Sequence, residues 1–185
     1  MSSVLADHAL EAHSTSDSGQ FSVSATVSRV AVDALQCDYV VTGPLSELVI
    51  SEAETAERTD GLWQTTCFEL FMSPADSMSY SEWNFATSRR WAAYRFDSYR
   101  EGMAPLLDCT VEIGTSRNDP KCLRLNANIR SPYIPSLGNA SVGLSAILEH
   151  KGGAKSFWAL THPPGLPDFH HRTCFATTLA PPKTA

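Results

Sequence analysis

The alternation of apolar and polar residues is the sequence feature that most restricts the fold. Four apolar residues of the segment 21–27 are separated by single polar residues: Phe21, Val23, Ala25 and Val27. The segment 37–41 repeats this spacing with Cys37, Tyr39 and Val41. Because successive side chains of a strand point to opposite faces, this period predicts strands with one buried face. No segment after residue 18 keeps the 3.6-residue period of a helix.

Turn residues separate further strand-like segments along the rest of the chain. The strongest turn signals are Asn118-Asp119-Pro120, Gly152-Gly153 and Pro163-Pro164-Gly165. About ten short strands between polar turns predict an all-β fold, a β-sandwich of jelly-roll or immunoglobulin-like type with antiparallel strands. The later strands are expected at 62–72, 80–85, 91–96, 108–114, 122–129, 142–150, 156–162 and 172–179.

Length and composition point to one domain. A chain of 185 residues fits a single hydrophobic core, and 43% hydrophobic residues supply its material. Residues 1–18, rich in Ser, Asp, Ala and His, are predicted to form a loose tail, and 19–181 to form the sandwich. The acidic segment 51–60 lacks an apolar face and is expected to be a surface loop.

The charges and cysteines restrict the partners. A net charge of −6 with scattered basic residues argues against nucleic-acid binding, which needs clustered Lys and Arg. About 18 consecutive apolar residues would be needed for a membrane span, and none occur. The N-terminus lacks the basic start and apolar run of a signal peptide. The odd number of cysteines, five, without a C-x-x-C pair, favours free thiols and a cytoplasmic location.

Aromatic residues are concentrated between residues 58 and 103, which hold three of the four tryptophans and three of the five tyrosines. Five strings in the chain resemble a bacterial branch of the DOMON-like proteins related to family-nine carbohydrate-binding modules. They are TCFELF (66–71), EWNF (82–85), WAAYRF (91–96), YREGM (99–103) and FWALTHPPGLPDFHH (157–171). The resemblance covers 58–103 and 140–179. It implies a jelly-roll-like sandwich from a superfamily that binds sugars or haem. In one departure, residues 87–90 (TSRR) replace the Ser-Pro-Ser-Gly type of turn typical of relatives.

Glu69 is the first candidate site residue, because it lies within an apolar strand. A buried carboxylate costs several kcal/mol unless it is paired, an effect of about the size of removing a charge from water. Two interpretations remain open. Glu69 forms a structural ion pair with Arg95, Arg100 or Arg124, or it contacts the hydroxyl groups of a ligand.

Glu82 and Asn84 share one face of the next strand and together offer acceptors and donors for hydroxyl groups. The turn at 87–90 decides which aromatic residues they oppose. A three-residue turn groups Trp83, Phe85, Trp91 and Arg95 on one face, whereas a turn one residue longer or shorter groups Trp83 and Phe85 with Ala92, Tyr94 and Phe96.

Other aromatic and charged residues complete the predicted ligand site. Trp63, at a junction between loop and strand, is a candidate for stacking on a sugar or for capping the core. Trp91 is a second stacking candidate, and Arg100 is a candidate for the polar edge of a ligand.

Histidines gather in the last part of the chain, where prolines stiffen the connection between His162 and the run Asp168–His171. His162, Asp168 and His170 are candidate ligand-binding residues. His162 or His170 could also bind a metal ion or haem, with Met72, Met78 or Met103 as a second axial ligand, although their spacing fits no zinc pattern. If 168–172 is extended, His170 and His171 point to opposite faces.

Catalytic motifs such as G-x-S-x-G, H-E-x-x-H and the P-loop do not occur. We therefore expect a non-catalytic domain that binds a small polar ligand, plausibly a saccharide, on an aromatic-lined concave face. Three alternatives stay open: a haem or metal module, an enzyme with paired carboxylates acting on a sugar-like substrate, and a partner-binding domain without a small ligand.

Overall fold

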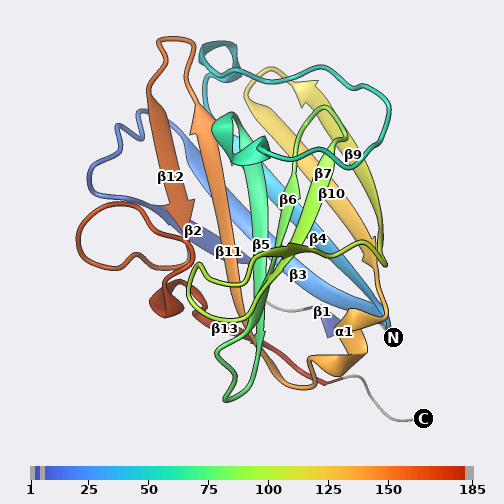
Figure 1. Cartoon of the computed structure of the whole chain (residues 1–185). Coiled ribbons are helices and arrows are strands. Elements are labelled where there is room, and N and C mark those ends of the chain that lie inside the picture. Colours follow the sequence, from blue (N-terminus) through green and yellow to red (C-terminus); the bar gives the residue numbers. More distant parts are fainter. Residues whose placement is uncertain (1–2, 5–6, 182–185) are drawn as a thin grey trace.

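The structure, a computed structural model, describes residues 3–4 and 7–181, and its regular secondary structure is almost entirely β-strand (Figure 1). The strands in chain order are β1 (Ser3–Val4), β2 (His8–Ala12), β3 (Ser22–Ala31), β4 (Ala34–Thr42), β5 (Cys67–Pro74), β6 (Tyr80–Phe85), β7 (Trp91–Phe96), β8 (Ala104–Pro105), β9 (Thr110–Asp119), β10 (Cys122–Arg130), β11 (Ala140–Glu149), β12 (Lys155–Ala159) and β13 (Thr177–Leu179). The helical segments are η1 (Leu45–Glu47), η2 (Leu62–Gln64), α1 (Tyr133–Ser136) and η3 (Arg172–Cys174). Within the described ranges, no helix is long and apolar enough to cross a membrane.

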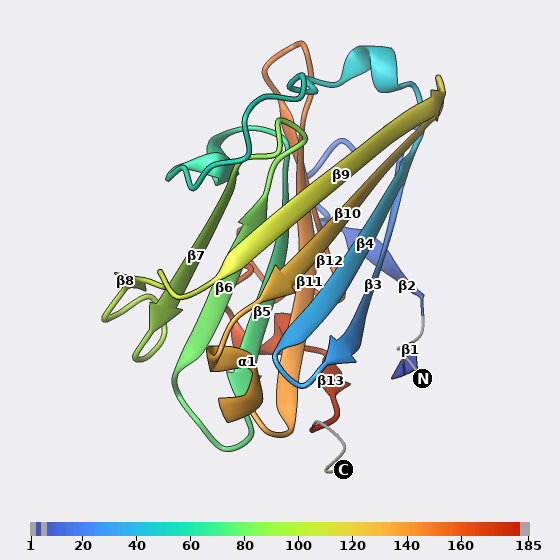
Figure 2. The same cartoon turned by 90° about the vertical axis from the view of Figure 1, so that its right-hand side faces the viewer.

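The strands form two antiparallel layers that face each other, as the view along their edges shows (Figure 2). The first layer has the order β3-β4-β10-β9, and the second has the order β8-β7-β6-β5-β11-β12. β1 pairs with β3, and β13 pairs with β11. The predicted all-β sandwich is confirmed.

β2 joins the two layers along one edge. It pairs with β12 of the second layer and with β3 of the first. This differs from the loose tail predicted for residues 1–18. The composition of that segment is polar, but Leu10 of β2 is buried and its backbone completes both sheets. Residues 1–2 and 5–6 of the predicted tail lie outside the described residues.

The main core lies between the layers and follows the alternation in the sequence. Val23, Ala25 and Val27 of β3 are buried there, as are Cys37, Tyr39 and Val41 of β4. In the second layer, every other residue of β5, namely Phe68, Leu70 and Met72, faces this core. Trp83 of β6 is fully buried among them, and its indole N–H donates to Ser81 Oγ at 3.1 Å.

A second apolar cluster covers the opposite, outer face of the second layer. It contains Cys67 and Phe71 of β5, Tyr94 and Phe96 of β7, and the C-terminal Phe169 and Phe175, among others. Because the segment after β12 covers β5, both faces of this strand are buried, which explains its nearly continuous apolar sequence. Glu69 shares the outward direction of Cys67 and Phe71, so it too is removed from bulk water.

The hairpin between β6 and β7 settles which aromatic residues face the core. The Ala86 N–H donates to the Arg90 carbonyl at 3.0 Å, and Phe85 lies opposite Trp91. The loop is therefore the three-residue alternative, and Arg89 completes it in the left-handed region at φ 74°. Trp83, Phe85 and Trp91 accordingly share the core face, whereas Tyr94 and Phe96 share the outer face with Glu82.

Candidate functional site

A cavity of about 420 Å³ opens on the outer face of the second layer. Its walls are mainly aromatic and apolar, with four polar side chains among them. The walls come from Trp63, Tyr94, Phe96, Met103, Ile147, Phe157, Pro167 and Phe169, and the polar groups come from Glu69, Glu82, Arg100 and His170. A concave, apolar site with a few convergent polar groups is the usual form of a small-ligand site.

Strand register brings the two glutamates together. Asn84 of β6 lies opposite Glu69 of β5, and Glu82 lies opposite Phe71, so Glu69 and Glu82 are diagonal neighbours on one face. The exposed fractions of the two residues, Glu69 and Glu82, are only 3% and 6%. Ser145 Oγ donates to Glu69 Oε2 at 3.3 Å, and Asn84 Nδ2 donates to Glu82 Oε1 at 2.8 Å.

Burial controls the ionisation of this pair. Loss of solvation raises the pKa of Glu69 well above the ordinary carboxyl value, and the charge of Glu82 raises it further. Loss of solvation also raises the pKa of Glu82, although the Asn84 amide and the Arg100 charge oppose this shift. Two buried carboxyl groups that repel each other retain a proton to higher pH than isolated ones. The pair therefore offers both a donor and several acceptors to a ligand.

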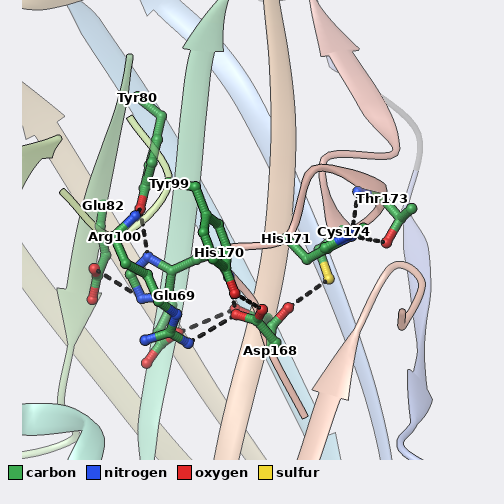
Figure 3. A network of polar contacts seen from close by, with 11 residues as sticks. Glu69, Tyr80, Glu82, Tyr99, Arg100, Asp168, His170, His171, Thr173 and Cys174 are labelled. Carbon is green, nitrogen blue, oxygen red and sulfur yellow. Dashed lines mark hydrogen bonds and ion pairs between the residues drawn. The ribbon is translucent and has the colours of Figure 1, made fainter. Parts of the chain in front are cut away.

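Arg100 is held at the cavity by Asp168 (Figure 3). Arg100 Nη2 lies 2.8 Å from Asp168 Oδ1, and the Tyr99 hydroxyl donates to Asp168 Oδ2 at 2.5 Å. Partial burial acts to raise the pKa of Asp168, but these two donors outweigh it and the pKa is lowered. Arg100 itself occupies the left-handed region, at φ 57°, in the turn after β7. The contacts tie this turn to the C-terminal segment across the cavity.

His170 lies between the Tyr80 hydroxyl and the carboxyl group of Glu82. The Arg100 backbone N–H donates to the Tyr80 hydroxyl at 3.1 Å, and this hydroxyl lies 2.7 Å from His170 Nδ1. Tyr80 can accept from Arg100 and donate its own proton to Nδ1 when Nε2 carries the ring proton. Nε2 lies 3.7 Å from Glu82 Oε2. Burial, and then the Arg100 charge, lower the pKa of His170 to about 4, so the ring between Tyr80 and the carboxyl pair is neutral near pH 7.

Replacing His170 with Asn is expected to flatten the decline of stability on acidification. Burial first, and then the Arg100 charge, lower the pKa of His170 from 6.5 to about 4, so the unfolded chain takes up this proton at higher pH than the folded one. His170 thus contributes stability that is complete above about pH 6.5 and is lost toward pH 4, by up to about 3 kcal/mol. Asn Oδ1 can still accept from Tyr80. Melting temperatures of both proteins across this range test the effect, and parallel curves would contradict it.

The structure places the predicted site residues in three groups. Trp63, Glu69, Glu82, Arg100 and His170 line the cavity. Asn84 and Asp168 stand behind it and bind the lining residues Glu82 and Arg100. Trp91 and His162 lie elsewhere.

Trp91 and His162 are kept from the cavity by strand direction and by local contacts. Trp91 is half-buried and packs against the core between the layers, because it shares the face of Phe85. His162 Nε2 lies 2.8 Å from the Glu11 carbonyl, and its ring packs on that of His13 with centroids 4.9 Å apart. It borders a separate hollow near β2.

Several cavity residues did not stand out in the sequence. Once the turn is known to have three residues, Tyr94 and Phe96 are predicted to share the strand face of Glu82. The length of the turn was therefore the missing signal. Phe157 and Phe169 are brought in by β12 and by the segment after it. No local pattern distinguishes them from core phenylalanines.

The described residues give no support to a haem or metal centre. In the described part of the chain, no three His, Cys, Asp or Glu side chains gather closely enough to hold a metal ion. Both ring nitrogens of His170 face protein groups, Tyr80 and Glu82. Of the three methionines named as second axial ligands, Met72 is buried in the core between the layers and Met78 is exposed outside the cavity lining, whereas Met103 lines the cavity. The condition of an extended run at 168–172 is not met, because these residues form a turn leading into η3, where His171 Nδ1 accepts from the Thr173 N–H.

The fold is similar to those of solved carbohydrate-binding proteins. A Bacteroides uniformis protein, provisionally assigned as carbohydrate-binding, superposes with a TM-score of 0.63 at 13% identity, over 92% of this chain and 84% of the other. A family-9 carbohydrate-binding module from Caldicellulosiruptor kristjanssonii, solved with cellotriose, has a TM-score of 0.52 at 15% identity, over 87% and 75% of the two chains. No protein-family model and no curated protein matches the sequence. At these identities the likeness establishes a shared β-sandwich fold.

Proposed function

We propose that the chain is a non-catalytic domain that binds a small saccharide in the cavity on the outer face of β5, β6 and β7. The observation that carries this proposal is the convergence of aromatic walls and two buried carboxyl groups in one cavity. Aromatic faces cover the C–H surface of a sugar ring, and carboxyl groups exchange hydrogen bonds with its hydroxyl groups.

Trp63 is the stacking residue in this proposal. Its side chain is 41% exposed, and its ring lies 6.3 Å from that of Tyr94 in an edge-to-face arrangement. It comes from η2, and the left-handed residue that precedes η2, Gly61, turns the chain out of the acidic loop. A large aromatic side chain left exposed at the rim of a cavity is available to a ligand.

The solved structures of similar fold support the saccharide class. One of these proteins is described with cellotriose bound, and the other is provisionally assigned to carbohydrates.

We also propose that the chain is a distant DOMON-like protein, because the strings between residues 58 and 103 and between 157 and 171 resemble those of that family. We propose further that it is cytoplasmic, because its five cysteines are free.

Replacing Trp63 with Ala is expected to weaken saccharide binding by at least about tenfold, the scale for removing an aromatic anchor at the centre of a binding site. Calorimetric titration with a panel of mono- and oligosaccharides measures the affinity. Val32→Ala is the matched control, since Val32 is an exposed apolar residue of the β3–β4 turn, in the other layer. The control should bind like the unmodified protein.

Two outcomes would contradict the proposal. In the first, no saccharide in the panel binds, or Trp63→Ala leaves the affinity unchanged. In the second, the incubated saccharides are converted to products, which would favour the enzyme with paired carboxylates.

A further inference from the structure

We infer that the preferred saccharide carries a protonated amine and that its ammonium group lies between the carboxyl groups of Glu69 and Glu82. This inference rests on the proposed binding of a saccharide in the same cavity and narrows its class to amino sugars. The argument begins from the balance of charge around the two glutamates.

The charged groups around the cavity leave the glutamate pair without a cation of its own. Arg100 is the cation among the described residues that line the cavity, and it pairs with Asp168 at 2.8 Å. His170 is neutral at about pH 6, because burial lowers its pKa to about 4, and its Nδ1 lies 2.7 Å from the Tyr80 hydroxyl. Glu69, Glu82 and Asp168 thus face a single guanidinium group. A buried carboxylate pair in this state needs either a retained proton or an added cation.

The hydrogen bonds of the pair are incomplete on the side that faces the cavity. Within the described chain, the one hydrogen bond to the Glu69 carboxyl comes from Ser145 and reaches Oε2, although this residue is only 3% exposed. Glu82 Oε1 accepts from Asn84, but Oε2 lies 3.7 Å from His170 Nε2, beyond normal hydrogen-bond length. Glu69 Oε1 and Glu82 Oε2 therefore accept no hydrogen bond from the described protein groups and can accept one from a ligand.

An ammonium group matches this arrangement better than a hydroxyl group. It offers three donors and no acceptor, whereas a hydroxyl has a single proton to share between two carboxylates. Its charge also replaces the proton that the pair would otherwise retain. The aromatic rings of Tyr94 and Phe96 line the same cavity, and ring faces attract cations as well as sugar C–H groups. The cavity thus provides charge, acceptors and walls suited to a cationic sugar.

Calorimetric titration tests this inference with three sets of ligands: glucosamine, galactosamine and mannosamine, their parent hexoses, and their N-acetyl derivatives. At about pH 6 a primary amine is protonated. We expect at least one amino sugar to bind at least about tenfold more tightly than both its parent hexose and its N-acetyl form. An affinity gain of this size is typical of one charge-assisted contact, here between the ammonium group and a carboxylate. Glu69→Gln and Glu82→Gln should each reduce this preference by about tenfold. Glu112→Gln, an exposed carboxylate of β9, should leave it unchanged.

The outcomes separate this inference from the function on which it rests. If a hexose or its N-acetyl form binds as tightly as the amino sugar, and Trp63→Ala weakens that binding, the amine inference is overturned and saccharide binding stands. If no sugar of the three sets binds, the amine inference is overturned, and the titrations with oligosaccharides decide whether saccharide binding stands. Gln is isosteric and uncharged, and thermal unfolding checks that the variants fold. If a variant does not fold, the preference of the unmodified protein for amino sugars over hexoses and N-acetyl forms tests the amine inference.

Discussion

Replacing Trp83 with Ala is expected to lower the free energy of unfolding by about 3–5 kcal/mol, the range for truncating a large aromatic residue in a core. Trp83 is fully buried in β6, between Leu70 of β5 and Ala93 of β7. Because both neighbouring strands are fixed by their own pairings, the site cannot collapse around the cavity that the indole leaves. The variant also leaves Ser81 Oγ without the indole donor.

Denaturant unfolding of this variant measures the loss, with Trp63→Ala as the matched control. Trp63 is 41% exposed at the rim of the cavity, so its truncation should cost less than about 1 kcal/mol. The two tryptophans are therefore expected to separate stability from ligand binding. A loss below about 1 kcal/mol for Trp83→Ala would contradict the placement of this residue in the core.

Replacing Asp168 with Ala is expected to weaken saccharide binding by at least about tenfold and to lower stability by about 1–2 kcal/mol. The Asp168 carboxylate accepts from Tyr99, from Arg100 and from the His170 backbone N–H. Its loss frees Arg100 and detaches the C-terminal segment that carries Phe169 and His170 into the cavity. The loss of stability stays small because Arg100 is half-exposed and its ion pair is partly screened.

Asp33→Ala is the matched control for this variant. Asp33 also pairs with an arginine, Arg130, at 2.6 Å, but in the turn between β3 and β4, on the other layer. Its replacement should leave saccharide affinity unchanged and cost no more than about 1 kcal/mol. Equal losses of affinity in the two variants would show that Asp168 has no special role at the cavity.

Strand alternation predicted the sandwich because burial of one face imposes period two on the sequence. β3 follows that pattern from Ser22 to Val27, and β4 follows it from Leu35 to Thr42. β2 could not be predicted in this way, since its role depends on pairing with β3 and β12, which are remote in the chain. A short, polar edge segment carries little periodic signal of its own.

The polar part of the candidate site was predictable, and its aromatic part was only partly so. Glu69 stood out because a carboxylate within an apolar strand must be accommodated, and Arg100 belongs to the same recognisable region. Trp63 was selected for its position at a junction between loop and strand, whereas Trp91 was selected by residue type. The length of one hairpin turn sends Trp91 to the core and Tyr94 to the cavity, and the sequence did not determine that length.

The most direct test of saccharide binding at this cavity follows the indole N–H signals of the tryptophans by nuclear magnetic resonance during a titration with the sugar panel. The indoles of Trp83 and Trp158 are buried and donate to Ser81 and Ser156, whereas Trp63 lines the cavity. We predict that a bound saccharide shifts the Trp63 signal and leaves those of Trp83 and Trp158 in place. A saccharide that binds without moving the Trp63 signal would contradict the assignment of this cavity as the binding site.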